Sequence, residues 1–65
     1  MLNLSEILLK HGDEISTFDE LKAVVVKEAL ETREMFFNLD IEPPVYDDRP
    51  DNWYDQLEIT FSSAR

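Results

Sequence analysis

A capping box opens the longest stretch of this sequence that is free of helix-breaking residues. Thr17 and Glu20 form the T-x-x-E pattern that marks a helix start, and no proline or glycine follows until Pro43. Three consecutive valines favour strand, but a strand would leave the capping box and the helical spacing of the apolar residues unexplained. We therefore predict one long central helix over about residues 18–38. Its buried face would carry Phe18, Leu21, Val25, Ala29 and Phe36.

A shorter helix is predicted before it. Asn3 and Glu6 have the spacing of a second capping box, and leucine and isoleucine residues then fall on one helical face. Lys10 and His11 are followed by Gly12, the only glycine in the chain, which is the usual chemistry of a helix end. These signals predict a short N-terminal helix over about residues 4–11.

The C-terminal half changes character. Three prolines exclude a regular helix from an acidic segment over residues 39–56, and residues 57–61 then alternate between apolar and polar side chains. That alternation predicts a strand, whose partner would be residues 39–41 or 45–46, because a lone strand leaves its backbone groups unpaired. We therefore predict an α+β fold for the single small domain 1–65, with a two- or three-stranded antiparallel sheet from the C-terminal half packed on the long helix.

The charge of the chain limits its partners. Among 65 residues there are 15 acidic and 6 basic side chains, which gives a formal net charge of −9. Such a surface repels nucleic acid phosphates and anionic lipids, and it is attracted to basic surfaces. The longest uncharged apolar run, residues 23–26, is far too short to cross a membrane, and no basic region precedes the apolar N-terminal residues. We expect a cytoplasmic protein.

The residues offer little for catalysis or for metal binding. His11 is the only histidine and lies at a predicted helix end, and there is no cysteine nucleophile or thiolate ligand. Residues 47–58 have the length of a calcium loop, but Arg49 stands at the third coordinating position and Asn52 where the loop needs glycine. We therefore expect no enzyme activity, no metal and no cofactor.

The acidic segment is the strongest functional signal. Between Asn38 and Glu58 there are seven acidic residues and one basic residue, Arg49. Carboxylates held apart by stiff, proline-containing backbone approximate the row of phosphates along a DNA strand. Aromatic side chains within this segment fit either the core or the anchor of an interface, and for Trp53 both roles stay open. The predicted partner-binding residues are Asp40, Glu42, Asp47, Asp48, Asp51, Trp53, Tyr54, Asp55 and Glu58.

In its small size, its acidity, its lack of cysteine and its clustered carboxylates, the chain resembles phage-encoded anti-CRISPR and antirestriction proteins, many of which mimic DNA. The resemblance implies a non-enzymatic inhibitor in the host cytoplasm that blocks DNA binding by a defence complex. Type I interference complexes fit this role because they hold DNA in long basic channels. An alternative from the residues alone is a small interaction or antitoxin-like subunit, which would bind a partner or a second copy through Val26, Leu30 and Phe37. The chain would then be a monomer or a weak homodimer.

Overall fold

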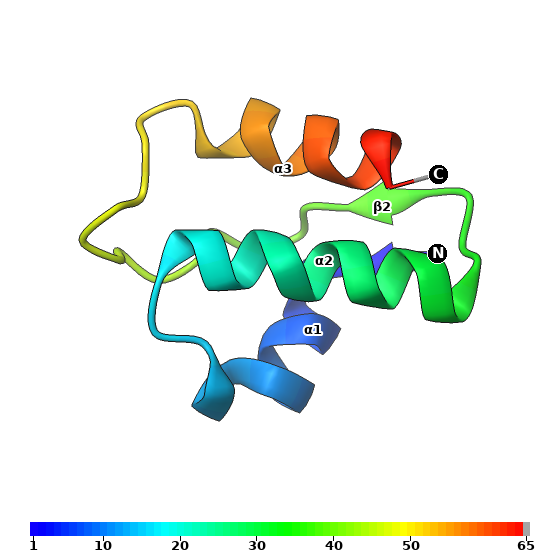
Figure 1. Ribbon diagram of the computed structural model, residues 1–65, viewed down its shortest axis with the longest axis horizontal. Coiled ribbons are helices and arrows are strands. Elements are labelled where there is room, and N and C mark those ends of the chain that lie inside the picture. Colours follow the sequence, from blue (N-terminus) through cyan, green and yellow to red (C-terminus); the bar gives the residue numbers. More distant parts are fainter. Residues whose placement is uncertain (65) are drawn as a thin grey trace.

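Three α-helices, one short 3-10 helix and one very small sheet make up the structure, a computed structural model that describes residues 1–64. The elements are, in chain order, β1 (Leu2–Asn3), α1 (Leu4–His11), the 3-10 helix η1 (Gly12–Glu14), α2 (Phe18–Thr32), β2 (Phe37–Asn38) and α3 (Trp53–Ser63). Helix α2 lies between α1 and α3 and packs against both of them (Figure 1). A connection without regular structure, residues 39–52, links β2 to the start of α3.

Helix α2 begins where the sequence predicted and ends earlier. The Thr17 hydroxyl accepts a hydrogen bond from the Glu20 amide at 3.1 Å, and the Glu20 carboxylate accepts one from the Thr17 amide at 3.1 Å, so the capping box is confirmed. The predicted end near residue 38 is wrong, because Arg33 adopts a left-handed conformation with φ of 56°. Left-handed residues commonly end helices, but they are usually glycine, and arginine gave no signal of this turn.

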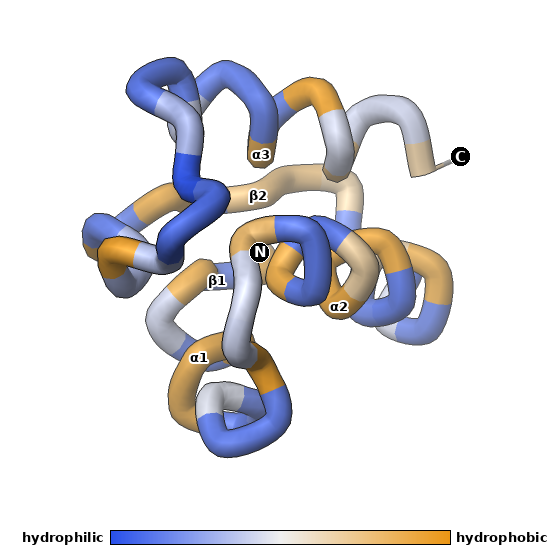
Figure 2. The backbone as a smooth tube through the Cα atoms, turned by 60° about the vertical axis from the view of Figure 1, so that its left-hand side comes forward, coloured by the Kyte–Doolittle hydropathy of each residue, from blue (hydrophilic) through white to orange (hydrophobic). Residues whose placement is uncertain are grey.

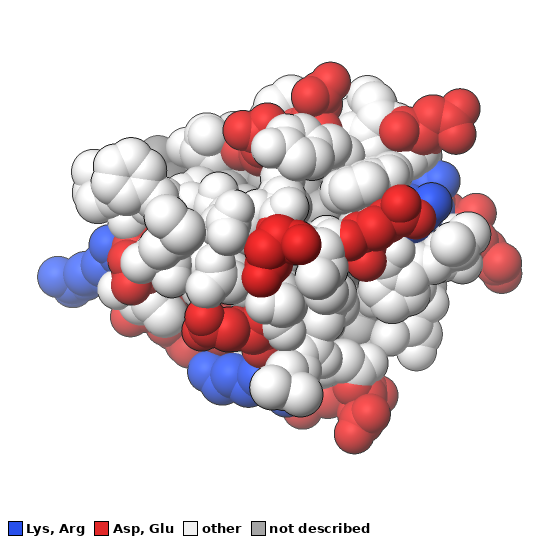
Figure 3. Space-filling view, turned by 180° about the vertical axis from the view of Figure 1, so that it is seen from behind, with Lys and Arg blue, Asp and Glu red and all other residues white. Residues whose placement is uncertain are grey.

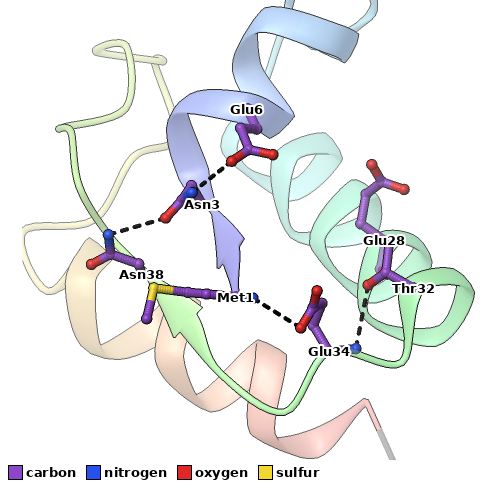
Figure 4. Close-up of polar contacts among 7 residues, drawn as sticks. All are labelled: Met1, Asn3, Glu6, Glu28, Thr32, Glu34 and Asn38. Atoms are coloured by element: carbon purple, nitrogen blue, oxygen red, sulfur yellow. Dashed lines mark hydrogen bonds and ion pairs between the residues drawn. The ribbon is translucent and has the colours of Figure 1, made fainter.

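The sheet also differs from the prediction. Strands β1 and β2 are parallel, with Leu2 opposite Phe37 and Asn3 opposite Asn38, so the predicted antiparallel sheet from the C-terminal half is wrong. The partner of residues 37–38 is the N-terminus of the chain, which lies beside β2 (Figure 1). The Leu2 amide donates to the Phe36 carbonyl at 2.9 Å, and the Asn38 side chain donates to the Asn3 side chain at 3.1 Å (Figure 4).

The strand predicted over residues 57–61 is part of helix α3. Leu57 and Phe61 are buried, whereas Ile59, the apolar residue between them, is 60% exposed. Residues four apart lie on one face of a helix, so the same five letters fit a helix that buries two of the three apolar side chains. The Thr60 hydroxyl donates to the Gln56 carbonyl at 2.7 Å, which satisfies it within the helix.

The core forms where the three helices meet. Hydrophobic and hydrophilic residues alternate along α2, and a hydrophilic stretch precedes α3 (Figure 2). The Phe37 ring stacks on Phe61 with 5.1 Å between ring centroids, which ties β2 to the inner face of α3. The buried hydrophobic residues are Leu2, Leu4, Ile7, Ile15, Phe18, Leu21, Val25, Ala29, Leu57 and Phe61.

Candidate partner-binding surface

Asp40, the first of the predicted partner-binding residues, caps helix α1. Its carboxylate accepts hydrogen bonds from the Ser5 amide at 3.0 Å and from the Ser5 hydroxyl at 2.5 Å. The bond from the hydroxyl and then that from the amide hold the pKa of Asp40 below its ordinary value. The expected cap, Asn3, makes no capping hydrogen bond and instead donates from its side chain to Glu6 at 2.6 Å (Figure 4). An aspartate 35 residues away from Ser5 thus satisfies the helix start.

Asp48 does the same for helix α2. Its carboxylate accepts hydrogen bonds from the Phe18 amide at 2.6 Å and from the Asp19 amide at 3.1 Å, the first two amides of the helix. The Phe18 hydrogen bond is the largest cause that lowers the pKa of Asp48, and the Asp19 amide and the positive charge of Lys22 act in the same direction. Together with the capping box, Asp48 satisfies the amides of the first turn that have no partner inside the helix.

Glu42 is paired with the one basic residue of the acidic segment. Arg49 donates to the Glu42 carboxylate at 2.9 Å and to the Pro43 carbonyl at 2.7 Å. Its guanidinium also lies 5.7 Å from the centre of the Trp53 ring. These contacts fold the segment back on itself, and they neutralise the Glu42 charge within the protein. The predicted row of free carboxylates from residue 40 to residue 58 is therefore interrupted, because Asp40, Glu42 and Asp48 are engaged within the protein.

The other four predicted carboxylates are exposed, and within residues 1–64 their side chains make no hydrogen bond or ion pair. Asp55 and Glu58 lie three residues apart on one face of α3, and Asp51 lies in the turn just before the helix. We call Asp51, Asp55 and Glu58 the α3 acidic face. Asp47 is exposed beside the capping residue Asp48. On the side of the molecule seen in Figure 3, acidic side chains are spread among neutral ones, and few basic side chains are present.

The two neighbouring aromatic residues at the start of α3 have different environments. Trp53 is partly buried and packs against the core, where Arg49 also contacts its ring. Tyr54 is 49% exposed, and its ring centroid lies 5.9 Å from that of Trp53. Trp53 therefore stabilises the fold, whereas Tyr54 stands on the surface next to Asp55, where an interface anchor is expected.

The structure also exposes an apolar surface that shares only Leu30 with the apolar partner-binding face predicted from the sequence. Leu30, Met35 and Phe36, which we call the apolar patch, are 54%, 69% and 70% exposed. Phe36 was expected on the buried face of a longer helix, and it is exposed because α2 ends at Thr32. Two shallow hollows meet at Met35. One is lined by Ala29, Leu30, Arg33 and Met35. The other is lined by Met35, Phe36, Phe37, Glu58, Phe61 and Ser62.

A buried carboxylate lies on the opposite side of α2. Glu28 is only 4% exposed, and its Oε1 accepts a hydrogen bond from Lys10 at 3.1 Å and lies 3.5 Å from His11 Nε2. His11 Nδ1 is also 3.5 Å from Glu14. This cluster joins the end of α1 to α2. Its arrangement is that of an ion pair at a helix–helix contact, and no sequence pattern indicated that Glu28 would be buried.

Two features are absent from the part of the chain that the structure describes, a metal-binding cluster and a membrane-crossing helix. Across residues 1–64, no three histidine or carboxylate side chains come together in a way that would hold a metal ion. None of the described helices combines the length and the apolar character that a membrane crossing requires. Compared with models of protein families, with curated proteins and with solved structures, the chain matches none.

Proposed function

We propose that this protein is a non-enzymatic inhibitor that occupies a basic nucleic-acid-binding surface of another protein. The observation that carries the proposal is the α3 acidic face, whose three carboxylates are exposed and have no partner within residues 1–64. The target class that fits best is a host defence complex that grips DNA, such as a type I CRISPR interference complex. The protein would act by DNA mimicry, in the cytoplasm of the host.

The distribution of charge supports this choice of partner. The chain carries a net charge of −9, and in the acidic segment the pairing of Glu42 with Arg49 leaves no free basic residue. Lysine and arginine side chains that neutralise phosphates would meet carboxylates at Asp51, Asp55 and Glu58 instead. Because α3 packs on α2 through Leu57 and Phe61, Asp55 and Glu58 are held on a packed helix. Rigid presentation reduces the ordering cost of binding.

DNA-binding competition tests the proposal. Purified type I interference complexes and a restriction endonuclease would be mixed with labelled target DNA and with the protein, and the bound DNA would be measured by gel shift. We expect the protein to displace DNA from at least one of them, with an effect that weakens by about tenfold or more from low to moderate salt, because charge pairs dominate the contact. Undiminished DNA binding by every complex would contradict the proposal.

A pair of charge-matched variants locates the surface. Asp55→Lys with Glu58→Lys and, as the control, Asp13→Lys with Glu14→Lys each raise the net charge by four. The control residues lie in η1, which is separated from α3 by α2 (Figure 1). We expect the α3 variant to lose inhibition while the η1 variant keeps most of it, with helix content checked by circular dichroism. Equal losses in both variants would show that only total charge matters.

The interaction subunit is the second candidate function, and one observation favours it. Leu30, one of the three residues expected to bind a partner through the long helix, is 54% exposed at the end of α2. Val26 and Phe37, the other two, are half-buried, and Phe37 packs against Phe61. The surface that remains for this role is therefore the apolar patch rather than one face of the helix.

A further inference from the structure

We propose that the apolar patch and the hollow beside it form an anchor site for a basic, amphipathic segment of the partner. The segment would place a large apolar side chain against Phe36, Phe37 and Phe61 and a lysine or arginine opposite Glu58. This inference rests on the proposed function, since it names where and how the basic partner is held. It also adds a hydrophobic contact to an interface that charge alone would leave weak and unspecific.

Exposure and residue type indicate that the patch binds something. Met35 and Phe36 are each more than two-thirds exposed, although the chain has a small core that would gain from burying them. Neighbouring large apolar residues on a surface mark contact sites more often than scattered ones do. Methionine adapts to different partners, and both phenylalanine and methionine are enriched at protein interfaces.

The shape of the site places apolar and acidic groups together. Glu58 belongs to the α3 acidic face, and it also lines the hollow formed by Met35, Phe36, Phe37 and Phe61. The floor of this hollow is fixed, because Phe37 stacks on Phe61 with a centroid separation of 5.1 Å. Phe36 is held by its backbone, whose carbonyl accepts the Leu2 amide in the sheet. A partner side chain would thus enter a preformed depression with a carboxylate at its edge.

Charge decides between a foreign partner and a second copy. Two copies would each bring a net charge of −9 to the contact, and repulsion of that size opposes self-association. A segment that carries lysine or arginine next to its apolar residue gains from Glu58 and from Asp55, one turn earlier in α3. Arg33 lines the other hollow, beyond Met35, and it favours an acidic or neutral residue at that end of the segment.

Two synthetic peptides of equal charge test the inference with the intact chain. One is an amphipathic helix with lysines on one face and phenylalanine and leucine on the other, and in the second peptide serine replaces the apolar residues. Binding would be measured by fluorescence anisotropy of the labelled peptides. We expect the amphipathic peptide to bind about tenfold more tightly, which is the size of effect one well-buried aromatic side chain gives.

Variants assign that difference to the patch. Phe36→Ser should remove the preference for the amphipathic peptide, whereas Leu9→Ser, at a residue that is 90% exposed on α1, should keep it. Circular dichroism and melting curves check that both variants fold. Equal affinity for the two peptides, or a preference that survives Phe36→Ser, would overturn the inference.

Three further outcomes separate this inference from the proposed function. If Asp55→Lys with Glu58→Lys weakens both peptides while Phe36→Ser weakens neither, charge binding stands and the apolar anchor is rejected. If sedimentation equilibrium shows a dimer that Phe36→Ser dissociates, a second copy occupies the patch, which also rejects the inference. No binding of either peptide rejects it too, and DNA competition then decides on the proposed function alone.

Discussion

The connection from β2 to α3 and helix α3 itself are both rich in acid, yet they use it in opposite ways. In the connection, Asp40 and Asp48 accept hydrogen bonds from the first turns of α1 and α2, and Glu42 is paired with Arg49. On α3, Asp55 and Glu58 are exposed and have no partner among residues 1–64. Asp40, Glu42 and Asp48 therefore stabilise the fold, whereas Asp55 and Glu58 are free to bind something else.

This difference shows why acidic composition alone does not locate a binding surface. A carboxylate is equally suited to a helix N-terminus, where amides lack partners, and to a basic protein surface. Asp47 and Asp48 are adjacent in the sequence, but only Asp48 reaches the amides of Phe18 and Asp19. Only the tertiary structure distinguishes the two uses.

The largest effect on stability is expected from truncating a side chain on the buried face of α3. Leu57 is fully buried, so Leu57→Ala should cost about 2–5 kcal/mol, through lost burial and through the cavity left behind. For a domain this small, such a loss is a large part of the total stability. Ile59→Ala, at an exposed position of the same helix, should leave the denaturation midpoint nearly unchanged. Similar midpoints for the two variants would show that α3 does not pack on the core as described.

A smaller effect is expected when the capping carboxylates are replaced. Asp48→Asn and Asp40→Asn should each lower the melting temperature by several degrees, since a neutral amide is a weaker acceptor and does not complement the helix dipole. Glu58→Gln, at an exposed position in the middle of α3, is the matched control and should change little. If all three variants melt alike, the distinction between the two groups of acids fails.

The smallest effect is expected in how stability depends on pH, when the capping variants are compared with the unchanged protein. Hydrogen bonds from Ser5 and from Phe18 lower the pKa of Asp40 and of Asp48 below the ordinary value of 3.8. A carboxyl group with a lowered pKa in the folded state adds stability that is complete above the unfolded value and is lost as the pH falls through the folded value. Melting curves between about pH 6 and pH 2 should thus fall less steeply for Asp48→Asn than for the unchanged protein. Parallel curves would contradict the capping role.

Local signals in the sequence predicted part of this fold correctly. The capping box at Thr17 correctly predicted the start of α2. Helix α1 ends at His11, but Gly12 does not stop the chain from turning, because it continues as the 3-10 helix η1. The end of α2 was missed because a left-handed arginine, rather than a glycine, terminates the helix. Residues 57–61 of α3 were predicted as a strand because Leu57, Ile59 and Phe61 alternate with polar residues. Leu57 and Phe61 also fit one face of a helix, and packing on α2 buries these two while Ile59 stays exposed.

The candidate surface was predictable only in part. The excess of acid between Asn38 and Glu58 was evident, and it contains the α3 acidic face. Its division into capping and free carboxylates depends on contacts across about thirty residues or more, such as Asp48 with Phe18, and no local pattern encodes these. Most of the apolar patch could not be predicted for a related reason. On the predicted longer helix Phe36 would be buried, but in the structure the chain turns at Arg33 and Phe36 is exposed.

An NMR titration of the isotope-labelled protein with the amphipathic lysine peptide tests most directly whether α3 carries the free, partner-binding carboxylates. We expect the largest shifts at the amides of Tyr54, Asp55 and Glu58 and at Phe36, with the amides of Ser5, Phe18 and Asp19 unmoved because their carboxylate partners stay in place. Shifts concentrated at Ser5, Phe18 and Asp19 would mean that the peptide takes Asp40 and Asp48 from the helix starts, and the division between structural and binding acids would be wrong.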